Sequence, residues 1–296
     1  MTTASWSSRL RHDSDATFRE WGSELAGKMA VVGLVQTSDT GQINWTTVAR
    51  AGVNTEAGYE IWRFNDTLQS TAPIYMRVGY GTGSTATHPR LQFTVGTGSD
   101  GAGVITGTAL STARAASGGA VQTGDTARQS YMCAVDGFFG FNWKVGSGGS
   151  EASFFVCRTA DSTGAATATG AMVSWGNGSI AGAARQAMRF ATTAIAYTAQ
   201  TSVDNAALAL NPQAVTSTVV GSDLQVFLGW TITPRAEPLF GVCGVLTGEI
   251  TAGSTFTATL IGTTSRTFLV WSSVGGPFGS ISAGSAGGLS TAMLWE

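Results

Sequence analysis

The sequence predicts a mostly β protein, an antiparallel β-sandwich or jelly roll with one N-terminal amphipathic helix. Two observations lead to this fold class. After residue 55, apolar residues alternate with polar ones, many of them threonine, over short segments, which is typical of strands with one buried face. Glycine-rich clusters at 81–84, 96–103 and 146–150 separate such segments and favour tight hairpins. Long helical patterns do not alternate with the strands, so a parallel α/β fold is not expected.

The helix is expected at about residues 14–29. Asp13, Ser14 and Asp15 supply side-chain oxygens that suit the first turn of a helix. Four apolar residues then recur at intervals of three and four, on one face: Phe18, Trp21, Leu25 and Met29. Such a stripe has to be buried, either on the β domain that follows or on a neighbouring subunit. The second alternative makes it a candidate assembly interface and makes residues 1–50 a helix and anchoring segment.

Residues 51–296 are assigned to the β domain. Its clearest strand candidates alternate with a period of two: 74–80, 91–95, 226–232 and 255–260. Two stretches, at about 108–128 and 176–222, are rich in small and polar residues with weak or no periodicity. We interpret them as long loops, which in compact domains are usually functional or ordered by a partner.

The composition excludes several classes of protein. Charged residues make up 11% of the chain, against roughly 25% in an average globular protein, which argues against charge-driven disorder and against a coiled coil. The net charge is −2 and the pI about 5.7, so binding of nucleic acid through a basic surface is not expected. No apolar run approaches the roughly 18 residues of a membrane-spanning helix, so no membrane span is expected either.

The cysteines and the first residues bear on where the protein is made. Cys133, Cys157 and Cys243 are an odd number at wide spacing, which does not resemble a disulfide framework. We expect them to be small buried side chains in a protein made in a reducing cytoplasm. Residues 1–11 are polar, so a signal peptide is not expected.

The search for a nucleophile or a metal site predicts none. The two histidines are His12, just before the helix, and His88, in a turn, and neither accompanies a Gly-x-Ser-x-Gly motif. Zinc sites need clustered Cys and His, and the sequence has no Cys-x-x-Cys or His-x-x-x-His. A phosphate-binding glycine loop followed by a helix is also missing, so we expect no catalytic residue, metal or cofactor.

Carboxylates leave one further possibility open. Glycoside hydrolysis needs two of them across a cleft, and nothing in the sequence selects a pair from the acids near turns: Asp66, Asp136, Asp161 and Asp223. The run Gly-Ser-Asp-Gly-Ala-Gly at 98–103 resembles half of a calcium loop, but its single acid favours a hairpin turn. The numerous aromatic residues, 9 Trp and 14 Phe, are expected mainly in the core, with an interface or sugar stacking as alternatives.

Three segments carry a resemblance to a known class of proteins. Residues 58–107 include Gly-Tyr-Glu-Ile-Trp-Arg-Phe-Asn-Asp and Pro-Ile-Tyr-Met-Arg-Val-Gly-Tyr-Gly-Thr-Gly, and residues 154–164 read Phe-Phe-Val-Cys-Arg-Thr-Ala-Asp-Ser-Thr-Gly. The third segment is 253–262, together with the strand 266–271. They resemble structural proteins of tailed-bacteriophage virions, which are only loosely described as tail, fibre or structural components.

The resemblance implies assembly and not catalysis, because these segments carry no catalytic residues. It leads us to expect a tail, baseplate or fibre component, made in the host cytoplasm and located in the virion. Its partners would be other virion proteins and copies of itself, in a closed homo-oligomer with three-fold or six-fold symmetry. Two alternatives remain: a capsid decoration or head-fibre protein, and a domain that binds or depolymerises host-surface glycan.

Overall fold

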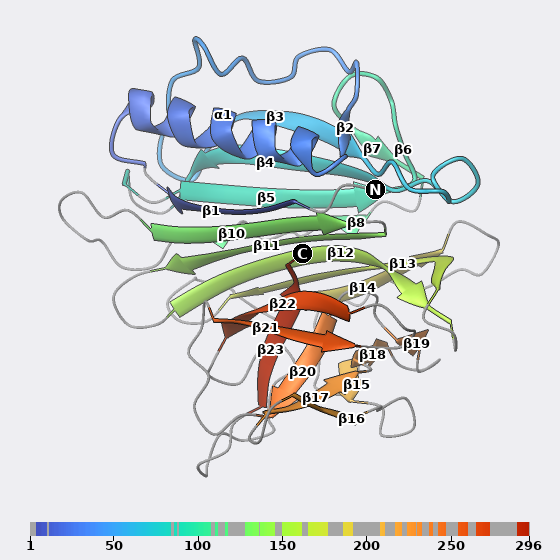
Figure 1. Ribbon diagram of the computed structural model, residues 1–296. Helices are drawn as coiled ribbons and strands as arrows, with labels where there is room; N and C mark the ends of the chain where they lie inside the picture. The colour runs from blue at the N-terminus through green and yellow to red at the C-terminus, as the bar shows by residue number, and fades with distance from the viewer. Residues whose placement is uncertain are drawn as a thin grey trace.

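The computed structural model shows a mostly β chain of antiparallel sheets, with one helix in the part that it describes (Figure 1). The fold class is therefore confirmed at this level. The described residues are 4–10, 12–83, 86–87, 89–107, 110–111, 116–117, 128–135, 137–145, 150–161, 165–176, 186–191, 208–210, 217–220, 224–228, 230–232, 237–238, 242–246, 254–259, 265–272 and 289–295.

Helix α1 spans Asp15–Val31, which confirms the predicted helix; it begins one residue later and ends two residues later than expected. Ser14 is its N-cap: the Ser14 hydroxyl oxygen accepts from Thr17 N at 3.1 Å, and Ser14 N donates to Thr17 Oγ1 at 3.0 Å. This reciprocal pair satisfies two backbone N–H groups that the first turn leaves free. Past the last turn, Gly33 adopts φ 95°, a conformation that favours glycine and turns the chain away.

The first sheet holds most of the strands that precede residue 120. Its order is β2-β3-β4-β5-β8, and β9 also pairs with β5. The strands are β2 Val35–Gln36, β3 Glu56–Arg63, β4 Tyr75–Thr82, β5 Pro89–Gly96, β8 Leu110–Ser111 and β9 Ala116–Ser117. A separate ribbon follows β5, formed by β6 Gly98–Ser99 and β7 Ile105–Thr106.

The second sheet begins with the first strand of the chain and continues with strands from its middle. Its order is β1-β10-β11-β12-β13-β14. The strands are β1 Ala4–Leu10, β10 Arg128–Val135, β11 Phe138–Val145, β12 Ser150–Ala160, β13 Ala166–Gly176 and β14 Gln186–Ala191. Strand β1 precedes α1 in the chain and pairs with β10, so the N-terminal segment is part of this sheet.

The C-terminal strands form a third sheet and a small one. The third sheet has the order β16-β17-β20-β23-β22-β21, and the small sheet β15-β18-β19. The third sheet contains β16 Ser217–Val220, β17 Leu224–Leu228, β20 Val242–Leu246, β21 Thr255–Thr259, β22 Ser265–Ser272 and β23 Leu289–Leu294. The small sheet contains β15 Leu208–Leu210, β18 Trp230–Ile232 and β19 Glu237–Pro238.

Most of the individual strand predictions hold. The expected strands at 74–80, 91–95 and 255–260 correspond to β4, β5 and β21. The expected strand at 226–232 is instead two strands, β17 and β18, which lie in different sheets. Alternation records which side of a segment is apolar and not which strand lies beside it, so it gave no sign of this break.

The two stretches interpreted as loops are partly strand. Strands β8 and β9 fall within 108–128, and β14, β15 and β16 fall within 176–222. These strands have two to six residues, and several are pairings at a sheet edge, so they lack the length that gives a clear period. The rest of both stretches lies outside the described residues.

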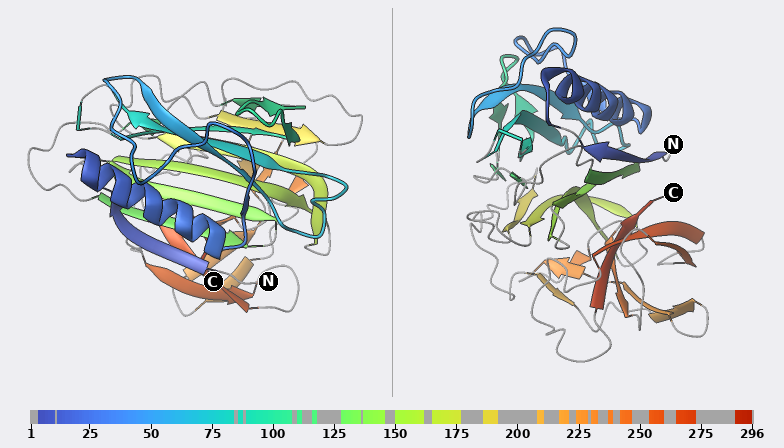
Figure 2. Two further views of the ribbon diagram at one scale, coloured as in Figure 1. Left: turned by 90° about the horizontal axis from the view of Figure 1, so that it is seen from above. Right: turned by 90° about the vertical axis from the view of Figure 1, so that its left-hand side faces the viewer.

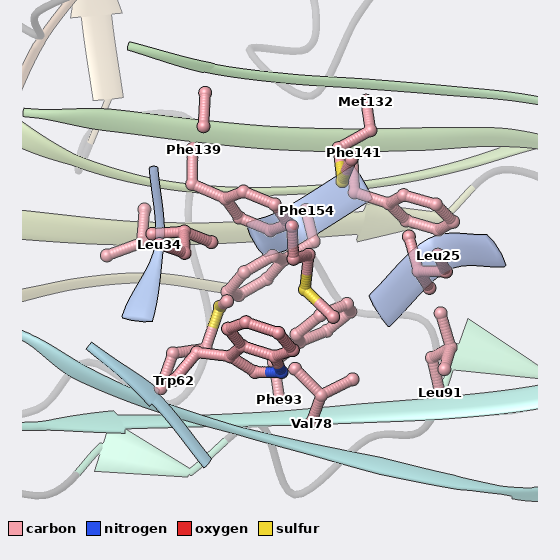
Figure 3. Packing of buried hydrophobic residues seen from close by; sticks show 14 of the residues in the cluster. Leu25, Leu34, Trp62, Val78, Leu91, Phe93, Met132, Phe139, Phe141 and Phe154 are labelled. Carbon is pink, nitrogen blue, oxygen red and sulfur yellow. The ribbon is translucent and has the colours of Figure 1, made fainter. Parts of the chain in front are cut away.

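One buried cluster joins α1 to the first and second sheets. The first sheet lies above the second in Figure 1, and α1 runs beside both, as the right-hand view of Figure 2 shows. Phe93 of β5 stacks on Phe154 of β12, with ring centroids 3.7 Å apart and planes 4° apart. Figure 3 shows these rings between the strands of the two sheets, with Leu25 of the helix at one side. The expected segments 1–50 and 51–296 therefore share one core.

The last strand ties the third sheet to the second. Beyond β23, Trp295 packs its ring edge-on against Tyr131 of β10, with centroids 5.8 Å apart. The carbonyl oxygen of Trp295 accepts from Cys133 Sγ at 3.3 Å, and Trp295 N donates to the carbonyl of Thr267 in β22 at 2.8 Å. One residue thus contacts both sheets.

A close approach between α1 and Trp45 gives a first testable prediction. A Cβ on Gly22 would overlap the indole ring of Trp45, whereas a Cβ on Gly27, in the same helix, would meet no atom within 4 Å. We expect Gly27→Ala to raise the free energy of unfolding by about 0.5–1 kcal/mol, because alanine favours the helix. We expect Gly22→Ala to lower it by about 1–2 kcal/mol, because overpacking outweighs that gain. Urea unfolding of both variants checks this, and a stabilised Gly22→Ala would contradict the packing.

Candidate functional site

The apolar stripe of α1 lies inside the protein. Phe18, Trp21, Leu25 and Met29 are each 1–3% exposed and belong to the cluster shared by both sheets. Trp21 packs edge-on against Tyr80 of the first sheet and against Phe141 of the second, with centroids 6.4 Å apart in each case. Of the two alternatives for the stripe, the structure has the one in which it packs on the chain's own strands. These four side chains are thus not an exposed assembly surface, because both sheets already cover them.

The most unusual polar group in this core is the carboxylate of Glu60, on β3, which is 1% exposed. Three donors surround it: Tyr80 Oη at 2.7 Å, Trp45 Nε1 at 2.8 Å and Trp62 Nε1 at 3.2 Å. Tyr80 and Trp62 come from the strands of the first sheet, and Trp45 from the segment between β2 and β3. A buried carboxylate is tolerated only when hydrogen bonds replace its water, and these three do so.

Burial changes the ionisation of this centre. Loss of water raises the pKa of Glu60, although the hydrogen bonds from Tyr80, Trp45 and Trp62 work in the opposite direction. The pKa of Tyr80 is raised well above its usual value, first by burial and then by the neighbouring charge of Glu60. The phenol therefore remains protonated and acts as a donor.

Sequence reasoning did not single out Glu60, although a signal for it exists. Glu60 and Trp62 lie on the same face of β3, the face that β4 continues with Val78 and Tyr80. A lone acid on a strand face that is otherwise apolar indicates a buried, hydrogen-bonded carboxylate. Its three partners lie 2, 15 and 20 residues away, so spacing alone did not identify them.

His12 occupies a structural position beside this centre. Its Nε2 lies 3.0 Å from Thr82 Oγ1, and the Thr82 hydroxyl donates to the carbonyl of Ala51 at 2.7 Å. Because a hydroxyl has one proton, His12 Nε2 is the donor to Thr82. The His12 carbonyl accepts from Arg50 Nη1 at 2.8 Å, so this residue ties the connection between β1 and α1 to the loop before β3. His88 lies outside the described residues.

Of the carboxylates that were considered for catalysis, the two described ones, Asp66 and Asp161, hold local structure through hydrogen bonds. Asp66 pairs with Arg158 of β12: Arg158 Nε lies 2.5 Å from Asp66 Oδ2, and Nη2 lies 2.8 Å from Oδ1. Both side chains are buried, and Arg158 Nη1 has no hydrogen-bond partner among the described residues. Asp161 accepts from Ala165 N at 3.0 Å within a turn. Asp136 and Asp223 lie outside the described residues.

The glycine-rich run at 98–103 forms a hairpin, as expected. Its acid, Asp100, accepts from the backbone N–H groups of Ala102 and Val104 at 2.8 and 3.0 Å, and these bonds lower its pKa. Asp39, from the loop after β2, accepts from Ser99 Oγ and from Gly103 N. Both carboxylates therefore hold the turn of the β6–β7 ribbon through hydrogen bonds. Within the described residues, no group of three metal-ligating side chains gathers here or elsewhere.

The remaining expectations concern cysteines, aromatics and membranes. Cys133 and Cys157 are buried, as predicted, and Cys243 lies in β20. The aromatic side chains of the shared cluster are buried between the sheets, which is the core alternative. Among the described residues, no helix combines the length and apolar character needed to cross a membrane. Comparison with known proteins finds no matching family model, no matching curated protein and no matching solved structure.

Proposed function

We propose that this chain is a structural protein of a tailed-bacteriophage virion, most specifically a tail, baseplate or fibre component, which acts by assembly and not by catalysis. One observation carries the proposal. The segment that resembles such proteins, 58–107, supplies β4, β5 and most of β3 of the first sheet, and its acids Glu60, Asp66 and Asp100 all accept hydrogen bonds from within the chain. A segment built in this way supports a rigid scaffold more readily than a reaction site.

The form of the scaffold belongs to the same proposal. We infer that the first and second sheets make a β-sandwich, in which α1 closes one side. The stacking of Phe93 on Phe154, and the position of Trp21 between Tyr80 and Phe141, support it. Sandwiches with short paired strands expose few unpaired edges, which suits a protein present in repeated copies.

The assembled form is proposed to be a closed homo-oligomer of three-fold or six-fold symmetry in the virion, in contact with other virion proteins. The contact surface has to be one other than the stripe of α1, since that stripe lies in the core. For the same reason, removing residues 1–30 would not test attachment. It would take away β1 and most of α1, and we expect it to abolish folding.

Quantitative mass spectrometry of purified particles tests the proposal. We expect peptides of this chain in the particles. With the major capsid protein as the reference for counting, the number of copies per particle should be a small multiple of three or six. A copy number close to that of the capsid protein would favour a decoration protein instead. Particles without these peptides would refute a virion role, and glycan-array binding or release of reducing sugar would then be the next measurements.

A further inference from the structure

We draw no further inference here: the strongest candidate, the buried side-chain cluster of Asp66 and Arg158 between β12 and the segment after β3, is the ion pair already described, which holds these two parts of the fold together and adds no site to it.

Discussion

Asp66→Ala is expected to lower the free energy of unfolding by about 3–5 kcal/mol, because it leaves the buried guanidinium of Arg158 without its counter-charge. The pair joins the segment after β3 to β12, and both side chains are almost fully covered. The loss in free energy of unfolding comes from the desolvated charge that remains on Arg158, and not from the free energy of the ion pair itself. Chemical denaturation monitored by circular dichroism measures it.

Two controls separate this reason from a general effect of losing an acid. Asp15→Asn breaks the exposed pair with Arg50, and it should cost far less, since water and salt screen that contact. The double variant Asp66→Leu, Arg158→Met removes both charges, and it should recover most of the stability lost in Asp66→Ala. A double variant as unstable as Asp66→Ala would show that the uncompensated charge is not the cause.

Phe93→Ala is expected to cost a similar amount, about 3–5 kcal/mol, because it opens a cavity where the two sheets meet. Phe93 stacks on Phe154 and also contacts Phe141 at a centroid distance of 6.4 Å. Phe93→Leu keeps most of the apolar volume and should cost clearly less. Val53→Ala is the surface control, since Val53 is 47% exposed, and it should change stability by no more than about 0.5 kcal/mol.

A double-mutant cycle turns this prediction into a test of the layered core. If Phe93 and Phe154 share one contact, the losses of Phe93→Ala and Phe154→Ala should not add, and the coupling should be about 0.5–3 kcal/mol. Additive losses would contradict the direct packing of the first sheet on the second.

Local patterns in the sequence predicted local structure well. The spacing of Phe18, Trp21, Leu25 and Met29 predicted α1, and alternation predicted β4 and β5. These signals depend on neighbours within a few residues, where chain geometry fixes which side chains share a face. The same signals do not say what covers a face, which is why the stripe of α1 left two alternatives open.

The polar centres could not be predicted for the same reason. Asp66 and Arg158 lie 92 residues apart, and their pairing depends on how the first sheet sits on the second. Glu60 finds Tyr80 because β3 pairs with β4, but its bond to Trp45 depends on the path of an irregular segment. The proposed function rests mainly on the resemblance of residues 58–107 to virion structural proteins. The structure adds that the acids of this segment accept hydrogen bonds from within the chain.

The most direct measurement is electron microscopy of purified phage particles labelled with a gold-tagged antibody against this chain, with an immunoblot of the same particles. We expect a band on the blot and gold at the tail, the baseplate or the fibres. Gold spread over the head would contradict the tail assignment and favour a decoration protein. Particles with neither label nor band would contradict the virion proposal as a whole.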